Sequence, residues 1–389
     1  KKTLVAIAAL AATGAFAQST VTITGIADAG YQSGKEFGQN ATMVQQNGSR
    51  TSALKFVGVE DLGGGMKAKF QIGTDMSITA NDGNNNNIGS SMSATPATLA
   101  TANGTAQVKN QASAQSGLVG AEQNYVGLQG GFGEVQFGTV NTNTLGTFGM
   151  AVQNFGTAIG GGYKKGIYGG YTRYENSMVY MTPAYNGFSA RYQNGAGNAS
   201  QYSLTGASVT LRRPTINELG LNYAQGPLTA SYSNLTSKNS PNETTATANV
   251  KTTIDTFAAA YDFGVAKVAF GMQNIKDDAA TALDTKATNL SVTAPYGKFL
   301  FLANVGSLKY NAGPGVQTTG GVSQVGQKNT ITGLGVHYNL SKNSYIYLLN
   351  ETQKLDALAY SSAIINGAAG TATSDHKRNL TAIGISTAF

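Results

Sequence analysis

Short segments in which apolar and polar residues alternate recur along this chain in pairs, and a short turn joins the members of each pair. Within Met66–Met76, one face carries Met66, Ala68, Phe70 and Ile72, and the other carries Lys67, Lys69, Gln71 and Gly73. A glycine-rich turn at 61–65 separates this segment from Thr51–Val59, which alternates in the same way. Alternation with a period of two on both sides of such a turn predicts a β-hairpin.

The same pattern predicts seven hairpins in all. They are Thr51–Val59 with Met66–Met76, Glu122–Gln129 with Glu134–Val140, Asn176–Thr182 with Phe188–Asn194, Ile216–Tyr223 with Leu228–Asn234, Thr253–Asp262 with Ala266–Gln273, Ala287–Ala294 with Lys298–Ser307, and Asn329–Asn339 with Ser344–Glu351. Two further strands, Val21–Tyr31 and Lys377–Phe389, have no local partner, so they can pair with each other and leave no open edge. We therefore expect an all-β fold, a 16-stranded antiparallel barrel.

Long segments rich in Gly, Ser, Thr, Asn and Ala separate the hairpins, and the longest is Ser77–Ser116. Compact soluble domains seldom contain several structureless loops of this length. Transmembrane barrels do, because their turns are short on the periplasmic side and their loops are long outside the cell. A membrane barrel also needs apolar outward faces, a polar interior and aromatic residues near the strand ends. Aromatic residues that fit the last requirement are Tyr31, Tyr223, Tyr261, Phe263, Phe299, Tyr338, Tyr345 and Phe389.

Composition narrows the class further. Charged residues make up only 12% of the 389 residues, Gly contributes 50 and Cys is absent. The absence of Cys excludes disulfides, thiolate metal sites and a Cys nucleophile, and no interior stretch reaches the roughly 20 apolar residues of a transmembrane helix. The Lys and Arg residues are scattered, so we expect no binding of nucleic acid.

The first 17 residues have the features of a secretory signal peptide. Lys1 and Lys2 give a positive start, an apolar stretch follows at 4–12, and Ala15-Phe16-Ala17 supplies a small-x-small cleavage site. We expect the mature chain to begin at Gln18 and the barrel to occupy residues 18–389. Removing the two lysines takes the formal net charge from +7 to +5.

Several segments, in this order and spacing, resemble Gram-negative general porins of the trimeric β-proteobacterial type. They are Val21–Gly30, Phe56–Ala68, Tyr125–Gly133, Asn176–Tyr180 and the C-terminal Phe389, which is similar to an outer-membrane assembly signal. The resemblance implies a homotrimer in the bacterial outer membrane, a third loop folded into the lumen, and passive diffusion of small hydrophilic solutes and ions. No cofactor is implied.

By position, the third loop runs from Asn141 to about Thr172, and here the chain departs from the family. Such loops usually carry carboxylates, but this one has no Asp or Glu and instead contains Lys164 and Lys165. Its aromatic residues Phe148, Phe155 and Tyr163 are expected to pack it against the wall or to line the opening.

Charge that faces the lumen is the candidate functional feature. Alternation points Lys55, Lys67, Lys69, Arg191, Lys267 and Asp28 inward, and Lys164 and Lys165 would add to them from the loop. A polar lumen with low-dielectric walls focuses the field of such charges and enriches counter-ions. We therefore expect a pore that mildly prefers small anions, although the same residues could be only the solvated side of a wide channel.

Other functions fit the sequence less well. A substrate-specific channel of the same fold would need a row of aromatic residues or fixed ligands along its path, and a β-rich surface adhesin would need no lumen. His337 and His376 are too few for a His-rich metal site, and no catalytic constellation is evident, so we expect neither a metal nor an enzyme. Asn81–Asn86 faintly resembles a calcium loop but lacks its terminal Glu.

Overall fold

The computed structural model describes residues 20–36, 39–40, 42–76, 78–79, 122–155, 159–161, 167–197, 199–204, 207–212, 214–238, 250–278, 284–313, 318–319, 322–323, 325–355 and 377–389. The expected signal peptide, all of Ser77–Ser116 except residues 78–79, and His376 lie outside these residues. No helix in the described part of the chain is long and apolar enough to span a membrane.

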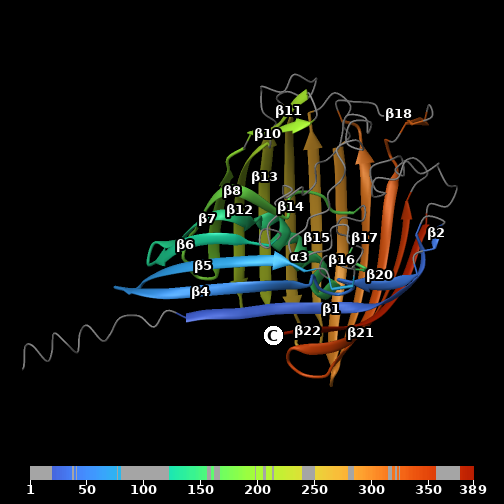
Figure 1. Cartoon of the computed structure of the whole chain (residues 1–389). Coiled ribbons are helices and arrows are strands. Elements are labelled where there is room, and N and C mark those ends of the chain that lie inside the picture. Colours follow the sequence, from blue (N-terminus) through green and yellow to red (C-terminus); the bar gives the residue numbers. More distant parts are fainter. Residues whose placement is uncertain are drawn as a thin grey trace, which may run out of the picture.

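Sixteen long antiparallel strands in the described residues form a closed barrel (Figure 1). They are β1 (Thr20–Glu36), β4 (Ala53–Gly63), β5 (Met66–Asp75), β6 (Asn124–Gly130), β7 (Gly133–Asn141), β8 (Arg173–Met181), β9 (Phe188–Gly195), β12 (Thr215–Gln225), β13 (Leu228–Lys238), β14 (Lys251–Asp262), β15 (Lys267–Asp277), β16 (Asp284–Tyr296), β17 (Phe299–Asn311), β20 (Lys328–Asn339), β21 (Ser344–Leu355) and β22 (Lys377–Ala388). The seven predicted hairpins and both terminal strands are confirmed.

The remaining elements lie in the connections. They are β2 (Gln39–Asn40), β3 (Met43–Gln46), α3 (Asn143–Val152), η1 (Gln153–Phe155), β10 (Ala199–Leu204), β11 (Ala207–Arg212), β18 (Thr318–Thr319) and β19 (Val322–Ser323). The hairpin β10–β11 extends from the long-loop end of the barrel, opposite the end that carries the C-terminus (Figure 1).

Pairing between β1 and β22 closes the sheet. The two strands are in register from Ile26–Ala388 to Glu36–Arg378. On its other side β1 pairs with β4 along residues 20–26 and with the short β3 along residues 29–32. At the short-turn end, Gly25 and Phe389 exchange two backbone hydrogen bonds of 2.9 and 3.0 Å. Each of the sixteen described barrel strands therefore has a partner on both sides.

The barrel places its apolar side chains outside and its polar side chains inside. Phe70 and Ile72 on β5 are outward, with Ile72 exposed, whereas Gln71 is buried inside. On β9, Phe188 and Tyr192 are exposed on the outside and Gln193 is buried in the interior. A soluble sandwich would bury the apolar face, so this arrangement is that of a barrel surrounded by apolar solvent.

Aromatic residues gather at the short-turn end of the outer surface. Exposed examples on neighbouring strands and turns are Tyr261, Phe263, Tyr296, Phe299 and Tyr338. The expectation for Tyr345 was wrong. Its ring points inward and stacks on His337 with the ring centroids 4.3 Å apart. The cause is register, since Ile346 and Leu348 occupy the outward positions of β21.

Phe389 covers the junction where the barrel closes. Its ring is 57% exposed on the outer surface, and a Cβ on Gly25 would overlap with it. Deleting Phe389 removes this contact and the last pair of hydrogen bonds between the chain ends. We expect a lower yield of folded barrel in outer membranes while secretion continues, measured as the heat-modifiable band on gels.

Phe389→Tyr is the matched control, because it keeps both the ring and the backbone bonds, and it is expected to fold normally. An undiminished yield of folded barrel after the deletion would show that Phe389 is dispensable for assembly.

Candidate functional site

The connection between β7 and β8 enters the barrel, as expected for the third loop. It begins with α3, whose N-cap Thr142 accepts a 3.2 Å hydrogen bond from the backbone N–H of Leu145. The helix then packs along the inner faces of β12 to β16 (Figure 1). The loop therefore lies against one wall of the barrel. The open part of the lumen lies between the loop on one side and the strands β4 to β9 on the other.

A wall carboxylate, Glu218 on β12, holds the start of α3. Its Oε2 accepts a hydrogen bond of 2.7 Å from the backbone N–H of Asn143, and its Oε1 accepts one of 2.8 Å from that of Thr144. The helix N-terminus has unpaired N–H groups and a partial positive charge, so it favours an anion at this point. The loop has no carboxylate of its own, and the wall supplies one.

The end of α3 is held by amide and hydroxyl groups of β16. Asn289 and Ser291 both donate to the carbonyl of Ala151, at 2.9 and 2.6 Å. Gln153 donates to the Ser291 hydroxyl at 3.0 Å. Close approach here requires glycine on β15, because a Cβ at Gly271 would overlap with the Cβ of Ala151.

The part of the loop beyond the helix contacts further strands of the barrel. Gly160 donates its N–H to Glu351 at 2.7 Å, and its carbonyl accepts from Asn304 at 2.8 Å. Gly169 donates to Gln273 at 2.8 Å. Together with the contacts of α3, polar groups on the five strands β12, β15, β16, β17 and β21 therefore anchor the loop at separate points.

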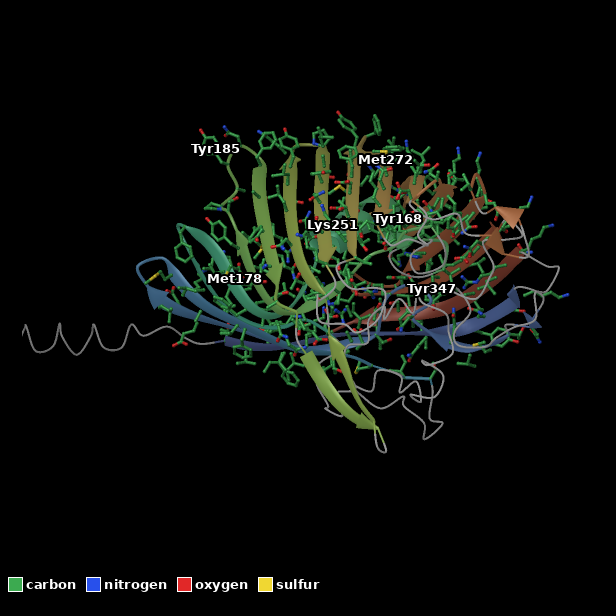
Figure 2. All side chains as sticks on the ribbon, turned by 90° about the horizontal axis from the view of Figure 1, so that it is seen from above. Tyr168, Met178, Tyr185, Lys251, Met272 and Tyr347 are labelled. Carbon is green, nitrogen blue, oxygen red and sulfur yellow. The ribbon has the colours of Figure 1, made fainter. Side chains whose placement is uncertain are left out.

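Apolar packing inside the barrel accompanies these polar anchors. Phe148 and Phe155 are buried against the wall, as expected, in a cluster that includes Ile167, Tyr168 and Tyr347. Tyr168 and Tyr347 lie inside the curved wall, among the other lumen side chains (Figure 2). Tyr163 lies outside the described residues.

On the facing wall, basic side chains are paired with carboxylates. Lys55 lies 2.8 Å from Glu122, and Arg173 bridges Glu122 at 2.8 Å and Asp75 at 3.3 Å. Burial opposes the ionisation of Glu122, but the charges of Arg173 and Lys55 outweigh it and hold the pKa of that carboxyl below its usual value. Glu122 therefore stays ionised near neutral pH.

One further pair lies on the same wall, and another joins β9 to the adjacent strand β12. Lys69 lies 2.8 Å from Glu134, and Arg191 lies 3.0 Å from Glu218. In each pair the cation is the more accessible partner, with side-chain exposures of 24% against 10% and 11% against 0%. Lys55 and Glu122 show the same order, 29% against 8%. At Lys55 and Lys69, water in the lumen therefore meets ammonium groups, while the paired carboxylates lie deeper in the wall. Arg191 is itself nearly buried, and the Arg173–Asp75 pair has the opposite order, with side-chain exposures of 20% against 34%.

The other predicted site residues have different surroundings. Lys267 is on an inward position of β15, and Lys67 is exposed next to the short-turn end of β5. Asp28 points inward but is 0% exposed, so it presents no carboxylate to the water in the lumen, contrary to the expectation that it lines the pore. Lys164 and Lys165 lie outside the described residues.

Asp28 instead forms hydrogen bonds inside the wall of the barrel. Its carboxylate accepts hydrogen bonds from the backbone N–H groups of Gly48 and Arg50 at 2.8 and 3.0 Å, and from the Tyr347 hydroxyl at 3.0 Å. These contacts fix the segment between β3 and β4 against the inner wall. A sequence pattern with a period of two gives the direction of a side chain but not what covers it.

Sequence reasoning missed several charged groups in the lumen. Arg50 donates to Ser386 at 2.8 Å and lies over the ring of Tyr345. Arg378 and Glu351 form a buried pair at 2.8 Å. Alternation along β21 and β22 could have found the last two, since both share a face with buried residues.

Comparisons with known proteins give the family. The chain matches the model of the Gram-negative porin family over residues 3–356. It is 30% identical over 369 residues to outer membrane porin protein 32 of Delftia acidovorans, a match that covers 89% of this chain and 88% of that protein. The chain belongs to the Gram-negative porin family. It is therefore a porin of the outer membrane, and the interior of the barrel is its channel.

Other relatives agree with this assignment. An outer membrane porin protein of Bordetella pertussis is 30% identical over 312 residues, or 71% of this chain and 70% of that protein. Among solved structures, an anion-selective porin from Comamonas acidovorans has a similar fold, with a TM-score of 0.68, 22% identity, and coverage of 96% of this chain and 100% of that one.

The double role of Glu218, which holds α3 and pairs with Arg191, leads to a prediction. Glu218→Gln leaves the Arg191 guanidinium buried without a counter-charge and weakens both helix N–H contacts. Breaking a buried pair in this way costs about 3–5 kcal/mol, enough to loosen the loop while the barrel stays folded. We expect noisier open-channel current in planar bilayers.

Glu134→Gln is the matched control, because it also removes one lumen carboxylate from a pair with a basic side chain, and Glu134 makes no hydrogen bond to the inserted loop among the described residues. Equal current noise in the two variants would contradict the anchoring role of Glu218.

Proposed function

We propose that this porin is a passive diffusion channel for small hydrophilic solutes with a modest preference for anions. The observation that supports this proposal is the order of burial in the wall pairs Lys55–Glu122 and Lys69–Glu134, where the cation is closer to water. The nearly buried pair Arg191–Glu218 has the same order, and Arg173–Asp75 has the opposite one. A formally neutral pair arranged in this way still presents its positive end to the lumen.

The expected size of the effect is small. In water a unit charge at 4 Å is worth about 1 kcal/mol, and salt screens charges beyond about 8–10 Å near physiological ionic strength. Each paired carboxylate subtracts part of the field of its cation. Several exposed cations along one wall of a narrowed lumen can therefore bias ion flow a few-fold, and the bias fades as salt is raised.

A substrate-specific channel is the second candidate. The described lumen does contain a cluster of rings, with Tyr345 stacked on His337 and Tyr347 at an edge. However, His337 is 2% exposed and Tyr347 is 0% exposed, so these rings are packed into the wall. They do not form a path of aromatic surface open to a solute, and the non-specific channel is favoured.

We also propose that three copies of the chain associate and that residues 1–17 are removed as a signal peptide. A solved structure of OmpT from Vibrio cholerae with a similar fold is described as a trimer form, with a TM-score of 0.61 and 13% identity. Residues 1–17 have the charged start, apolar stretch and cleavage site described above. The proposal assigns no chemical reaction to the chain.

Neutralising two wall lysines tests the ion preference. In the double variant Lys55→Gln/Lys69→Gln, the buried partners Glu122 and Glu134 remain, so the wall loses its positive ends and keeps its negative ones. We expect the reversal potential across a KCl gradient to move toward cation preference by a few-fold in permeability ratio.

Lys309→Gln is the control. Lys309 is exposed on the outer surface of β17, so this substitution removes one positive charge outside the lumen. The proposal is wrong if the wild type already prefers cations, or if the double variant and this control have the same reversal potential.

A further inference from the structure

Four charged side chains of the lumen wall form one connected cluster in which the sign of the charge alternates. Lys55 on β4 lies 2.8 Å from Glu122, which precedes β6. Arg173 on β8 lies 2.8 Å from Glu122 and 3.3 Å from Asp75 at the end of β5. We call these four residues the four-charge cluster. Because it contains two cations and two carboxylates, it is formally neutral.

The inner members of the cluster, Glu122 and Arg173, are held in place. A Cβ at Gly73 on β5 would overlap with the side chain of Glu122, so glycine at this position leaves the room that Glu122 occupies. Arg173 donates hydrogen bonds from Nη1 to Asp75 and from Nη2 to Glu122. Its Nε donates to Asn141 at 3.3 Å, so each of the three guanidinium nitrogens has a partner.

The two ends of the cluster are more accessible than its middle. The side chains of Lys55 and Asp75 are 29% and 34% exposed, whereas those of Glu122 and Arg173 are 8% and 20% exposed. By comparison, the carboxylate of Glu134 in the next wall pair is only 10% exposed. The four-charge cluster therefore presents both an ammonium and a carboxylate to the water in the lumen.

The spacing of these two ends suits a small molecule that carries both charges. Asp75 lies directly opposite Ala53, and Lys55 is two residues further along β4. Diagonal neighbours of this kind have backbones about 7–8 Å apart on the same face of a sheet. In an α-amino acid, one carbon separates the ammonium nitrogen from the carboxylate carbon, which are about 2.5 Å apart. With a hydrogen bond of about 2.8 Å at each end, such a molecule reaches across the gap.

Formal neutrality makes the cluster a better partner for a zwitterion than for a single ion. The neighbouring charge of opposite sign cancels part of the field of each end, and salt screens what remains beyond about 8–10 Å. A single ion is therefore attracted by one end and repelled by the next group along. A zwitterion in the opposite orientation is attracted at both ends and leaves neither of its charges without a counterpart.

We propose that the four-charge cluster is a weak binding site for small zwitterions of the α-amino acid class, with the solute carboxylate at Lys55 and the solute ammonium at Asp75. The Lys55 ammonium has three N–H donors, and its one carboxylate partner among the described residues is Glu122. Ion pairs in contact with water change an equilibrium by a factor of up to about five each, so the solute binds and leaves again. The proposal rests on the passive diffusion channel proposed above and names a solute class for it, but it requires no anion preference.

Single-channel conductance of the purified porin in planar bilayers tests this directly, with L-alanine added to KCl at about pH 6, where both of its groups are ionised. We expect a saturable decrease in conductance, because bound alanine occupies part of the path of the ions. In Asp75→Asn, which removes the contact for the ammonium, the half-saturating concentration should rise about three- to fivefold. Asp75→Glu keeps the carboxylate and is the matched control, expected to stay near the wild-type value. The conductance without alanine shows that each variant is folded.

Three related solutes keep the outcomes distinct. Lactate lacks the ammonium, alaninamide lacks the carboxylate, and lactamide, a neutral isomer of alanine, lacks both charges, so each should act more weakly than alanine. The proposal is overturned if lactate or alaninamide acts as strongly as alanine, since the site would then bind single ions. It is also overturned if alanine gives no saturable decrease in the wild type, or the same half-saturating concentration in Asp75→Asn. None of these results uses the reversal potential, so a failure of the ion preference remains a separate result.

Discussion

The hydrocarbon core of a bilayer offers backbone N–H and C=O groups no water to bond to, so every strand that crosses it must be paired on both sides. The rest of this structure depends on that constraint. The pairing of β1 with β22 satisfies this requirement because it closes the sheet. The backbone hydrogen bonds between Gly25 and Phe389 complete the junction at the short-turn end. Once the sheet is closed, alternation divides each strand into a face toward lipid and a face toward water.

The water-facing side then has to hold a loop that enters the barrel. The loop crosses from β7 to the wall of β12–β16 with no carboxylate in residues 141–172, and acids of the wall contact its backbone instead, through Glu218 at the start of α3 and Glu351 at Gly160. Each of these acids also pairs with a wall cation, Arg191 or Arg378. The same carboxylates therefore anchor the loop and partly neutralise the basic lumen.

The sequence was a good guide to the strands because their period of two is a local property. It predicted all sixteen, and it also predicted the inward direction of Lys55, Lys69 and Arg191. It could not predict their partners, since Glu122 lies just before β6, outside the alternating face, and the Lys69–Glu134 contact spans 65 residues. The sequence also could not show which inward side chains are buried. Asp28 and Tyr345 are inward residues whose surroundings are set by the segment between β3 and β4.

The central claim is that water in the lumen is exposed to the ammonium ends of the Lys55–Glu122 and Lys69–Glu134 pairs, whose carboxylates lie deeper in the wall. Ion substitution in planar bilayers tests it most directly, with the wild-type protein and single-channel conductance as the readout. Replacing chloride by a large organic anion, with potassium kept, should lower the conductance more than replacing potassium by a large organic cation, with chloride kept. A larger loss on replacing potassium would contradict the account.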